Sequence, residues 1–293
     1  MKLRKNKIVT FAIIILVLII VIKALSSFMR NGDNSKNYAT PWLLNKPIAH
    51  RGLHNDAIPE NSIKSFENAI NNKMTIELDV HMTKDNKVVV FHDRNLKRMT
   101  GLDKNIDECS YEEIKGLTLK DSKEKIPTFE EVLKFVNEKT SLLIEIKNEG
   151  KVGTLEEEVK KELQNYKGEY AVQSFNPFVL DWFKKNDPEV LRGQLVGSFK
   201  NEDMNGLKKF VLKNMLLNFK SRPNFIACEF KEGNKKFIDK QNVNGVPSIC
   251  WTIRTKEDLK IALKEYSNAI FENIDAKDVF EIGIMEYSNS KTK

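Results

Sequence analysis

Short apolar runs alternate with helix-like segments along most of the 293-residue chain. Such runs, bounded by polar and turn-forming residues, are typical of β-strands. The segments between most of them begin with helix-capping residues: Asn61 or Ser62, Thr128 with Glu131, Asn176 before Pro177, and Thr255 with Asp258. Nine strands are predicted, at residues 47–50, 75–80, 88–92, 141–147, 169–174, 193–197, 225–230, 248–253 and 269–273.

One of these runs does not fit a strand-helix repeat. Only the sequence TKDNK separates the second run from 88–92, whereas parallel neighbours need a crossover of a dozen or so residues. We therefore expect 88–92 to be the return arm of a hairpin. The eight remaining strand-helix units, over about 250 residues, predict an α/β fold of the TIM (β/α)8 type. An open doubly wound sheet is the alternative, disfavoured because no glycine-rich phosphate turn follows the first strand.

The segment 94–126 is longer than an ordinary βα loop. It predicts a small insertion above the face of the barrel where active sites form.

The first thirty residues have a different pattern. The basic sequence MKLRKNK precedes fifteen residues without a charge, 8–22, and after Lys23 an apolar stretch continues to Met29. A helix over 8–29, rising ~1.5 Å per residue, is long enough to cross a hydrocarbon core of ~30 Å. The alternative is a cleaved signal peptide with a site near Ala24 and Ser26, although the run exceeds the usual ~7 to 15 residues.

The predicted organisation is a basic tail and transmembrane anchor at 1–30, a linker at 31–44 and a barrel domain at 45–293. Basic residues precede the span more densely than they follow it, which places the domain outside the cell membrane. If the segment is cleaved, the domain is secreted.

The charge and the cysteine content argue against a nucleic-acid-binding protein and against a disulfide-rich one. The formal net charge is +7, and residues 1–30 account for +6 with six basic and no acidic side chains, which leaves +1 for the remainder. A domain so close to neutral is not expected to bind nucleic acid. The three cysteines, Cys109, Cys228 and Cys250, are an odd number and indicate buried thiols rather than a disulfide framework.

Charged residues alternate with apolar ones in two predicted strands. Because side chains alternate faces along a strand, Glu77 and Asp79 point one way while their apolar neighbours point the other. Glu145 and Lys147 share a face in the same manner. Three carboxylates inside a barrel suit a hard cation, Mg²⁺ or Ca²⁺. The alternative is an internal salt-bridge cluster with Lys147.

All four histidines lie between residues 50 and 92. His50 ends the first strand and His92 ends the hairpin arm, so both can reach one cleft beside the carboxylates. Imidazoles transfer protons near neutral pH, and we expect these two to be catalytic. His54, in a polar loop, and His81, near the turn, are expected to be bystanders.

A substrate class follows from the neighbouring cations. Arg51 offers a planar fork for phosphate oxygens, and Lys147 lies on the carboxylate strand. A divalent metal ion, these two basic side chains and two imidazoles together suit a phosphodiester, whose alkoxide leaving group needs a proton donor.

An ordered set of short strings then resembles the glycerophosphodiester phosphodiesterase family, relatives of phosphatidylinositol phospholipase C. The strings are AHRG, PENS, ELDVHMTKD, VVVFHD, TG, IPTFEEVL, EIK, QSFNP and WTI, and they run from about Pro47 to the C-terminus. The resemblance implies a TIM barrel that cleaves glycerophosphodiesters to glycerol 3-phosphate and an alcohol with a divalent cation.

The resemblance also implies roles for individual residues. His50 and His92 would be the acid-base pair, with Asn61 and Asp93 as supports. The metal ligands would be Glu77, Asp79 and Glu145, and the phosphate contacts Arg51 and Lys147. Phe175 and Trp251 would line the alcohol side of the site, unless they simply pack the barrel.

The sequence departs from the family pattern near its end. A small polar residue often stands where this chain has Arg254, and Thr-Asp often stands where it has Phe271 and Glu272. These departures concern the choice of substrate, which could be a glycerophosphodiester or a lysolipid. There are two alternatives to a glycerophosphodiester phosphodiesterase: a barrel that binds head groups without turnover, and a lysophospholipase D or phospholipase C-like activity on the same fold.

Overall fold

Eight parallel strands close into a barrel in the computed structural model, which describes residues 2–36, 40–148, 150–200, 203–232 and 235–291. β1 pairs with β2 on one side, Ile48 opposite Thr75, and with β9 on the other, Ile48 opposite Ile270, so the sheet has no free edge there. The predicted TIM barrel is confirmed and the open sheet is excluded. The barrel strands are β1 Ile48–Ala49, β2 Thr75–Met82, β4 Leu142–Ile146, β5 Tyr170–Ser174, β6 Leu191–Val196, β7 Phe225–Glu229, β8 Ser248–Ile253 and β9 Asn268–Phe271.

The ninth strand is the hairpin arm that the short connection predicts. β3 Val88–Val90 runs antiparallel to β2, with Val80 opposite Val90 and Met82 opposite Val88. β3 therefore lies outside the barrel and brings the residues that follow it beside Asp79, where the Phe91 amide donates to the Asp79 carbonyl at 3.0 Å.

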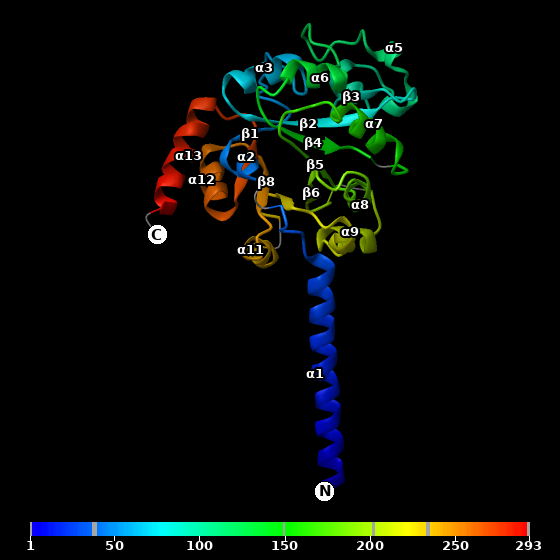
Figure 1. The fold of residues 1–293 in the computed structure, drawn as a ribbon, viewed down its shortest axis with the longest axis vertical. Helices are drawn as coiled ribbons and strands as arrows, with labels where there is room; N and C mark the ends of the chain where they lie inside the picture. The colour runs from blue at the N-terminus through cyan, green and yellow to red at the C-terminus, as the bar shows by residue number, and fades with distance from the viewer. Residues whose placement is uncertain (1, 37–39, 149, 201–202, 233–234, 292–293) are drawn as a thin grey trace.

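Helices surround the barrel (Figure 1), and four of them begin at the expected caps. The Thr128 hydroxyl accepts from the Glu131 amide at 3.1 Å, and the Asn176 side chain accepts from the Phe178 amide at 3.0 Å. Ser62, not Asn61, caps the helix after β1. The helices are α2 Pro41–Asn45, α3 Ile63–Asn71, α6 Phe129–Val136, α7 Thr154–Leu163, α8 Pro177–Asn186, α9 Gly206–Lys213, α10 Asn218–Ser221, α11 Lys235–Val243, α12 Lys256–Glu265 and α13 Ala276–Lys291.

The strand alternation separates two cores. Leu78, Val80 and Ile144 belong to the core between strands and helices, while Leu143 belongs to the core inside the barrel. Because Glu145 has the same parity as Leu143, it also points inward, as the alternation predicts. The barrel interior is thus apolar near the amino ends of these strands and acidic toward their carboxyl ends.

Residues 94–126 contain short helices, α4 Lys97–Thr100, a 3₁₀ turn at Ile106–Glu108 and α5 Tyr111–Ile114. They pack around a small apolar cluster of their own that includes Leu96, Met99, Ile106, Cys109 and Ile114. This separate core allows the insertion to stand beside the turn between β2 and β3, where the Lys84 amide donates to the Cys109 carbonyl, without entering the barrel.

The amino-terminal segment forms one helix, α1 Lys2–Arg30, that projects from the barrel (Figure 1). Its window Ile13–Arg30 is long and apolar enough to span a membrane and packs against nothing over most of its length. A signal sequence would satisfy the same criteria. All three cysteines are buried, as expected.

Candidate active site

Three carboxylates converge at the carboxyl ends of two neighbouring strands. Asp79 on β2 lies opposite Glu145 on β4 in the sheet register, and Glu77 lies two residues earlier on the same face. Each is at most 7% exposed, and one oxygen from each lies within 4.8 Å of the others. Burial, together with repulsion from Asp79 and Glu145, raises the pKa of Glu77 well above its usual range. The arrangement is unfavourable unless positive charge offsets it.

Two side chains supply part of that charge. Lys147 Nζ lies 2.7 Å from Glu145 Oε1 and 3.2 Å from Asp79 Oδ1. Arg51 Nε lies 3.6 Å from Asp79 Oδ2, and the Arg51 amide donates to Glu77 Oε2 at 2.9 Å. Burial opposes ionisation of Asp79, but Lys147 and the neighbouring cations hold its pKa below the usual range. Arg51 itself has a φ of 53°, an uncommon conformation that places its amide over the carboxylates.

His92 reaches the same cleft from the end of the hairpin. Its Nδ1 lies 2.7 Å from Asp93 Oδ1, so a hydrogen bond to this carboxylate directs Nε2 away from Asp93. His81 lies within β2, only 7% exposed, and its Nε2 lies 3.0 Å from the His92 carbonyl oxygen. Burial lowers the pKa of His81 to about 4, so we expect it to be neutral and to donate this bond.

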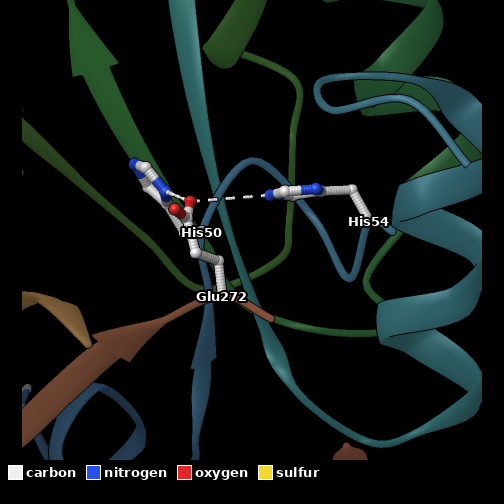
Figure 2. A group of neighbouring side chains, drawn as sticks. All are labelled: His50, His54 and Glu272. Carbon is white, nitrogen blue, oxygen red and sulfur yellow. Dashed lines mark hydrogen bonds and ion pairs between the residues drawn. The ribbon is translucent and has the colours of Figure 1, made fainter. Parts of the chain in front are cut away.

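His50 has a carboxylate partner that sequence reasoning missed. Its Nδ1 lies 2.5 Å from Glu272 Oε2, just beyond the end of β9, and Figure 2 shows this carboxylate between the rings of His50 and His54. His54 Nε2 is 3.6 Å from the same oxygen, too far for a hydrogen bond. Arg254 Nε donates to Glu272 Oε1 at 2.7 Å.

The surroundings of His50 and Glu272 set the protonation state of each group. Burial works against ionisation of Glu272, but the hydrogen bond from His50 and the nearby Arg254 hold its pKa below the usual range. Burial lowers the pKa of His50 to about 4. Glu272 therefore stays ionised, and His50 is neutral at neutral pH with Nδ1–H toward the carboxylate.

A second unpredicted set of charges joins the loop after β1 to the insertion. Glu60, within the PENS string, accepts from Arg51 at 2.8 Å and from Arg98 of α4 at 2.7 Å and 3.0 Å. Arg98 Nε also donates to Asp93 Oδ2 at 2.5 Å. Burial opposes the shift, yet the hydrogen bonds from Arg98 and the charge of Arg51 lower the pKa of Glu60 to about 2. Arg98 of the insertion thus contacts both Glu60, the partner of Arg51, and Asp93, the partner of His92.

A cavity of about 160 Å³ opens between these groups, and among its lining residues are His50, Arg51, His92, Lys147, Phe175 and Trp251. The Phe175 and Trp251 rings meet edge to face, with centroids 5.6 Å apart, so they both pack the barrel and border the cavity. Asn61 donates to Asp79 Oδ2 at 2.9 Å and holds that carboxylate in place. The structure therefore brings together all of the residues that the sequence predicted for the site.

The carboxylate cluster suits a hard divalent cation. Asp79 Oδ1 is fully buried without a hydrogen-bond donor, although Lys147 lies nearby. Oxygen ligands from three carboxylates are the donor set that Mg²⁺ and Ca²⁺ prefer. In the second group of possible metal ligands among the described residues, His50, His54 and Glu272, the one carboxylate is already paired with Arg254.

Comparisons with known proteins show the family of the chain. Residues 50–273 match the model of the Glycerophosphoryl diester phosphodiesterase family. The chain is 34% identical over 232 residues to a glycerophosphodiester phosphodiesterase of Caldanaerobacter subterraneus subsp. tengcongensis, covering 74% of this chain and 89% of that protein. It is 31% identical over 219 residues to YhdW of Bacillus subtilis (strain 168), covering 72% and 86%.

A solved structure shares the fold. A phosphodiesterase from Oleispira antarctica, determined in complex with the product sn-glycerol-3-phosphate, superposes with a TM-score of 0.67 at 24% identity, covering 84% of this chain and 98% of that one. Fold and relatives together define an enzyme class, the barrel hydrolases of phosphoric diesters. Within that class, the chain belongs to the glycerophosphoryl diester phosphodiesterase family.

Proposed function

We propose that the protein hydrolyses glycerophosphodiesters to glycerol 3-phosphate and an alcohol, with a divalent cation and an acid-base pair made of His50 and His92. The observation that carries the proposal is that two imidazoles, each held at Nδ1 by a carboxylate, border one cavity beside three buried carboxylates. A barrel that only binds head groups has no need of two oriented proton-transfer groups.

The chain's own residues account for binding and proton transfer. Arg51 and Lys147 offer positive charge to the phosphodiester oxygens, and Glu77, Asp79 and Glu145 would hold the cation. When bound, a cation supplies charge that offsets the developing negative charge on phosphorus-bound oxygens. One imidazole accepts a proton at Nε2 from the attacking water molecule, and the other donates a proton to the departing alkoxide.

The test is an assay of the full chain in detergent with glycerophosphocholine and either Mg²⁺ or Ca²⁺. Release of glycerol 3-phosphate and choline is the expected result. Release of phosphocholine would instead assign a phospholipase C-like cleavage. Saturable binding of the diester with no product would assign the head-group-binding alternative, and choline released only from lysophosphatidylcholine would favour lysophospholipase D.

Glu272 is proposed as the residue that positions His50. Glu272→Gln is expected to lower kcat by at least about tenfold with little change in KM. The reason is that the neutral amide can offer a donor to Nδ1, which favours the wrong tautomer, and gives an imidazolium no charge stabilisation. Steady-state kinetics over a range of pH are the measurement.

The control for this change is Glu272→Asp, which retains the charge and is expected to recover part of kcat. If Glu272→Gln lowers the melting temperature but leaves kcat and its pH profile unchanged, the carboxylate is a structural partner of Arg254 only.

We also propose that α1 anchors the enzyme, with the barrel outside the membrane. The intact chain is expected to fractionate with membranes and to lose its barrel to protease added outside the cell, because basic residues at 1–7 favour a cytoplasmic amino end. Immunoblotting of fractions before and after protease is the measurement. A barrel found free in the medium with an amino terminus near Ser27 would assign a signal peptide instead.

A further inference from the structure

The carboxyl end of α1 is attached to the barrel rather than separated from it by a free tether. Asn218 of α10 donates to the Arg30 carbonyl at 2.9 Å, and Lys240 of α11 donates to the Ser27 hydroxyl at 2.9 Å. The rings of Phe28 and Phe219 lie 6.4 Å apart. The last turn of the candidate membrane span therefore rests on α10 and α11.

The residues after the helix continue this contact. The Gly32 amide donates to the Gln241 side chain at 3.1 Å, and the Asp33 amide donates to the Pro223 carbonyl at 2.8 Å. A Cβ at Gly32 would lie 2.5 Å from that carbonyl oxygen, so the chain is as close as glycine permits. The side of the barrel that carries these helices is consequently held next to the end of the span.

That side exposes apolar residues without a protein partner among the described residues. None of the side chains of α9 is buried, and Leu207 and Phe210, three residues apart on one face of the helix, are 74% and 57% exposed. Val243, at the end of α11, is 86% exposed. In Figure 1, α9 and α11 lie at the edge of the barrel from which α1 leaves.

The same side is basic. Residues 206–222 contain five basic residues and no aspartate or glutamate. They are Lys208, Lys209, Lys213, Lys220 and Arg222. A short amphipathic segment with exposed large apolar residues and lysines beside them is typical of a helix that lies in the interface of an anionic bilayer.

We propose that α9, α10 and the carboxyl end of α11 form a membrane-docking surface that binds the headgroup region of the bilayer spanned by α1, with a preference for anionic lipid. This inference rests on the proposed anchor. A bilayer is the occupant that the structure favours, because the span ends on α10 and α11 and the charge of the surface complements anionic headgroups. Docking would hold the barrel in one orientation instead of letting it swing about the end of α1.

The experiment uses the full chain reconstituted in vesicles of phosphatidylcholine with or without phosphatidylglycerol. The cysteine introduced by Phe210→Cys is labelled with an environment-sensitive fluorophore, and quenching of its fluorescence by nitroxide-labelled lipid is measured. The native cysteines are buried, so the label reaches the introduced one. The control is Glu112→Cys, an exposed position on α5, and this helix lies far from α1 in Figure 1. Hydrolytic activity of both variants in detergent confirms that they are folded.

The expected result is quenching at position 210 well above that at position 112, stronger with phosphatidylglycerol and weakened by salt. Lys208→Glu combined with Lys213→Glu should reduce it. Equal quenching at both positions in protein that floats with the vesicles overturns the docking surface but not the anchor. Protein that fails to float overturns the anchor. Disulfide-linked dimers of unlabelled Phe210→Cys would assign the surface to a second copy of the chain and also overturn the inference.

Discussion

Replacing either His50 or His92 by alanine is expected to lower kcat/KM for glycerophosphocholine by at least ~100-fold, the usual contribution of a positioned acid or base. Each imidazole borders the cavity with its Nδ1 held by a carboxylate, Glu272 or Asp93, which leaves Nε2 available for proton transfer. Because one imidazole must be neutral and the other protonated, the wild type should show a bell-shaped dependence of kcat/KM on pH. Steady-state kinetics with and without each substitution are the measurement.

The matched control is His54→Ala. His54 lies in the same cluster and is as well buried as His50, yet its Nε2 is 3.6 Å from Glu272 and it does not border the cavity. We expect its kcat/KM to change little. A near-normal rate in His50→Ala or His92→Ala would remove that residue from the mechanism.

The barrel and the carboxylate cluster could be predicted because both depend on local alternation. In a strand, the parity of a residue decides its face, so Glu77 and Asp79 between apolar residues already indicate an acidic interior. Proximity of His92 to this strand followed from the short TKDNK connection, which allows only a hairpin.

Glu272 could not be predicted in the same way, because its role depends on the closure of the barrel. It is separated from His50 by 222 positions, and only the pairing of β1 with β9 brings them together. The sequence shows merely that Phe271-Glu272 replaces a common Thr-Asp, which suggested an effect on substrate choice. In the structure, Glu272 contacts His50, so the same departure bears on the proposed acid-base pair.

The contacts of Glu60 and Arg98 also escaped the sequence analysis. Residues 94–126 were expected to lie above the site, but no periodic pattern shows which side chain of an insertion reaches the barrel. His81 is similar: the sequence predicts a bystander near the turn, whereas in the structure β2 continues through His81 and its ring contacts the His92 carbonyl. Side-chain partners across loops depend on tertiary geometry that alternation does not encode.

Removing the divalent cation is expected to abolish hydrolysis and to lower the melting temperature of the wild type. Without the cation, Glu77, Asp79 and Glu145 repel one another in a buried cluster, and Lys147 and Arg51 offset this only in part. A cation that binds only the folded state adds about 2.7 kcal/mol of stability at a hundredfold excess over Kd. Thermal unfolding with chelator and with Mg²⁺ or Ca²⁺ measures the shift.

Glu145→Gln distinguishes a cation site from an internal salt-bridge cluster by the sign of its effect. If the carboxylates hold a cation, the substitution weakens metal binding but leaves the metal-free protein as stable or more stable, because one of three repelling charges is gone. If Lys147 alone balances the cluster, the same substitution breaks the 2.7 Å contact between Lys147 and Glu145 and destabilises the protein with or without metal. A wild type whose melting temperature ignores every divalent ion, together with a variant that melts lower in chelator, would refute the metal site and the mechanism built on it.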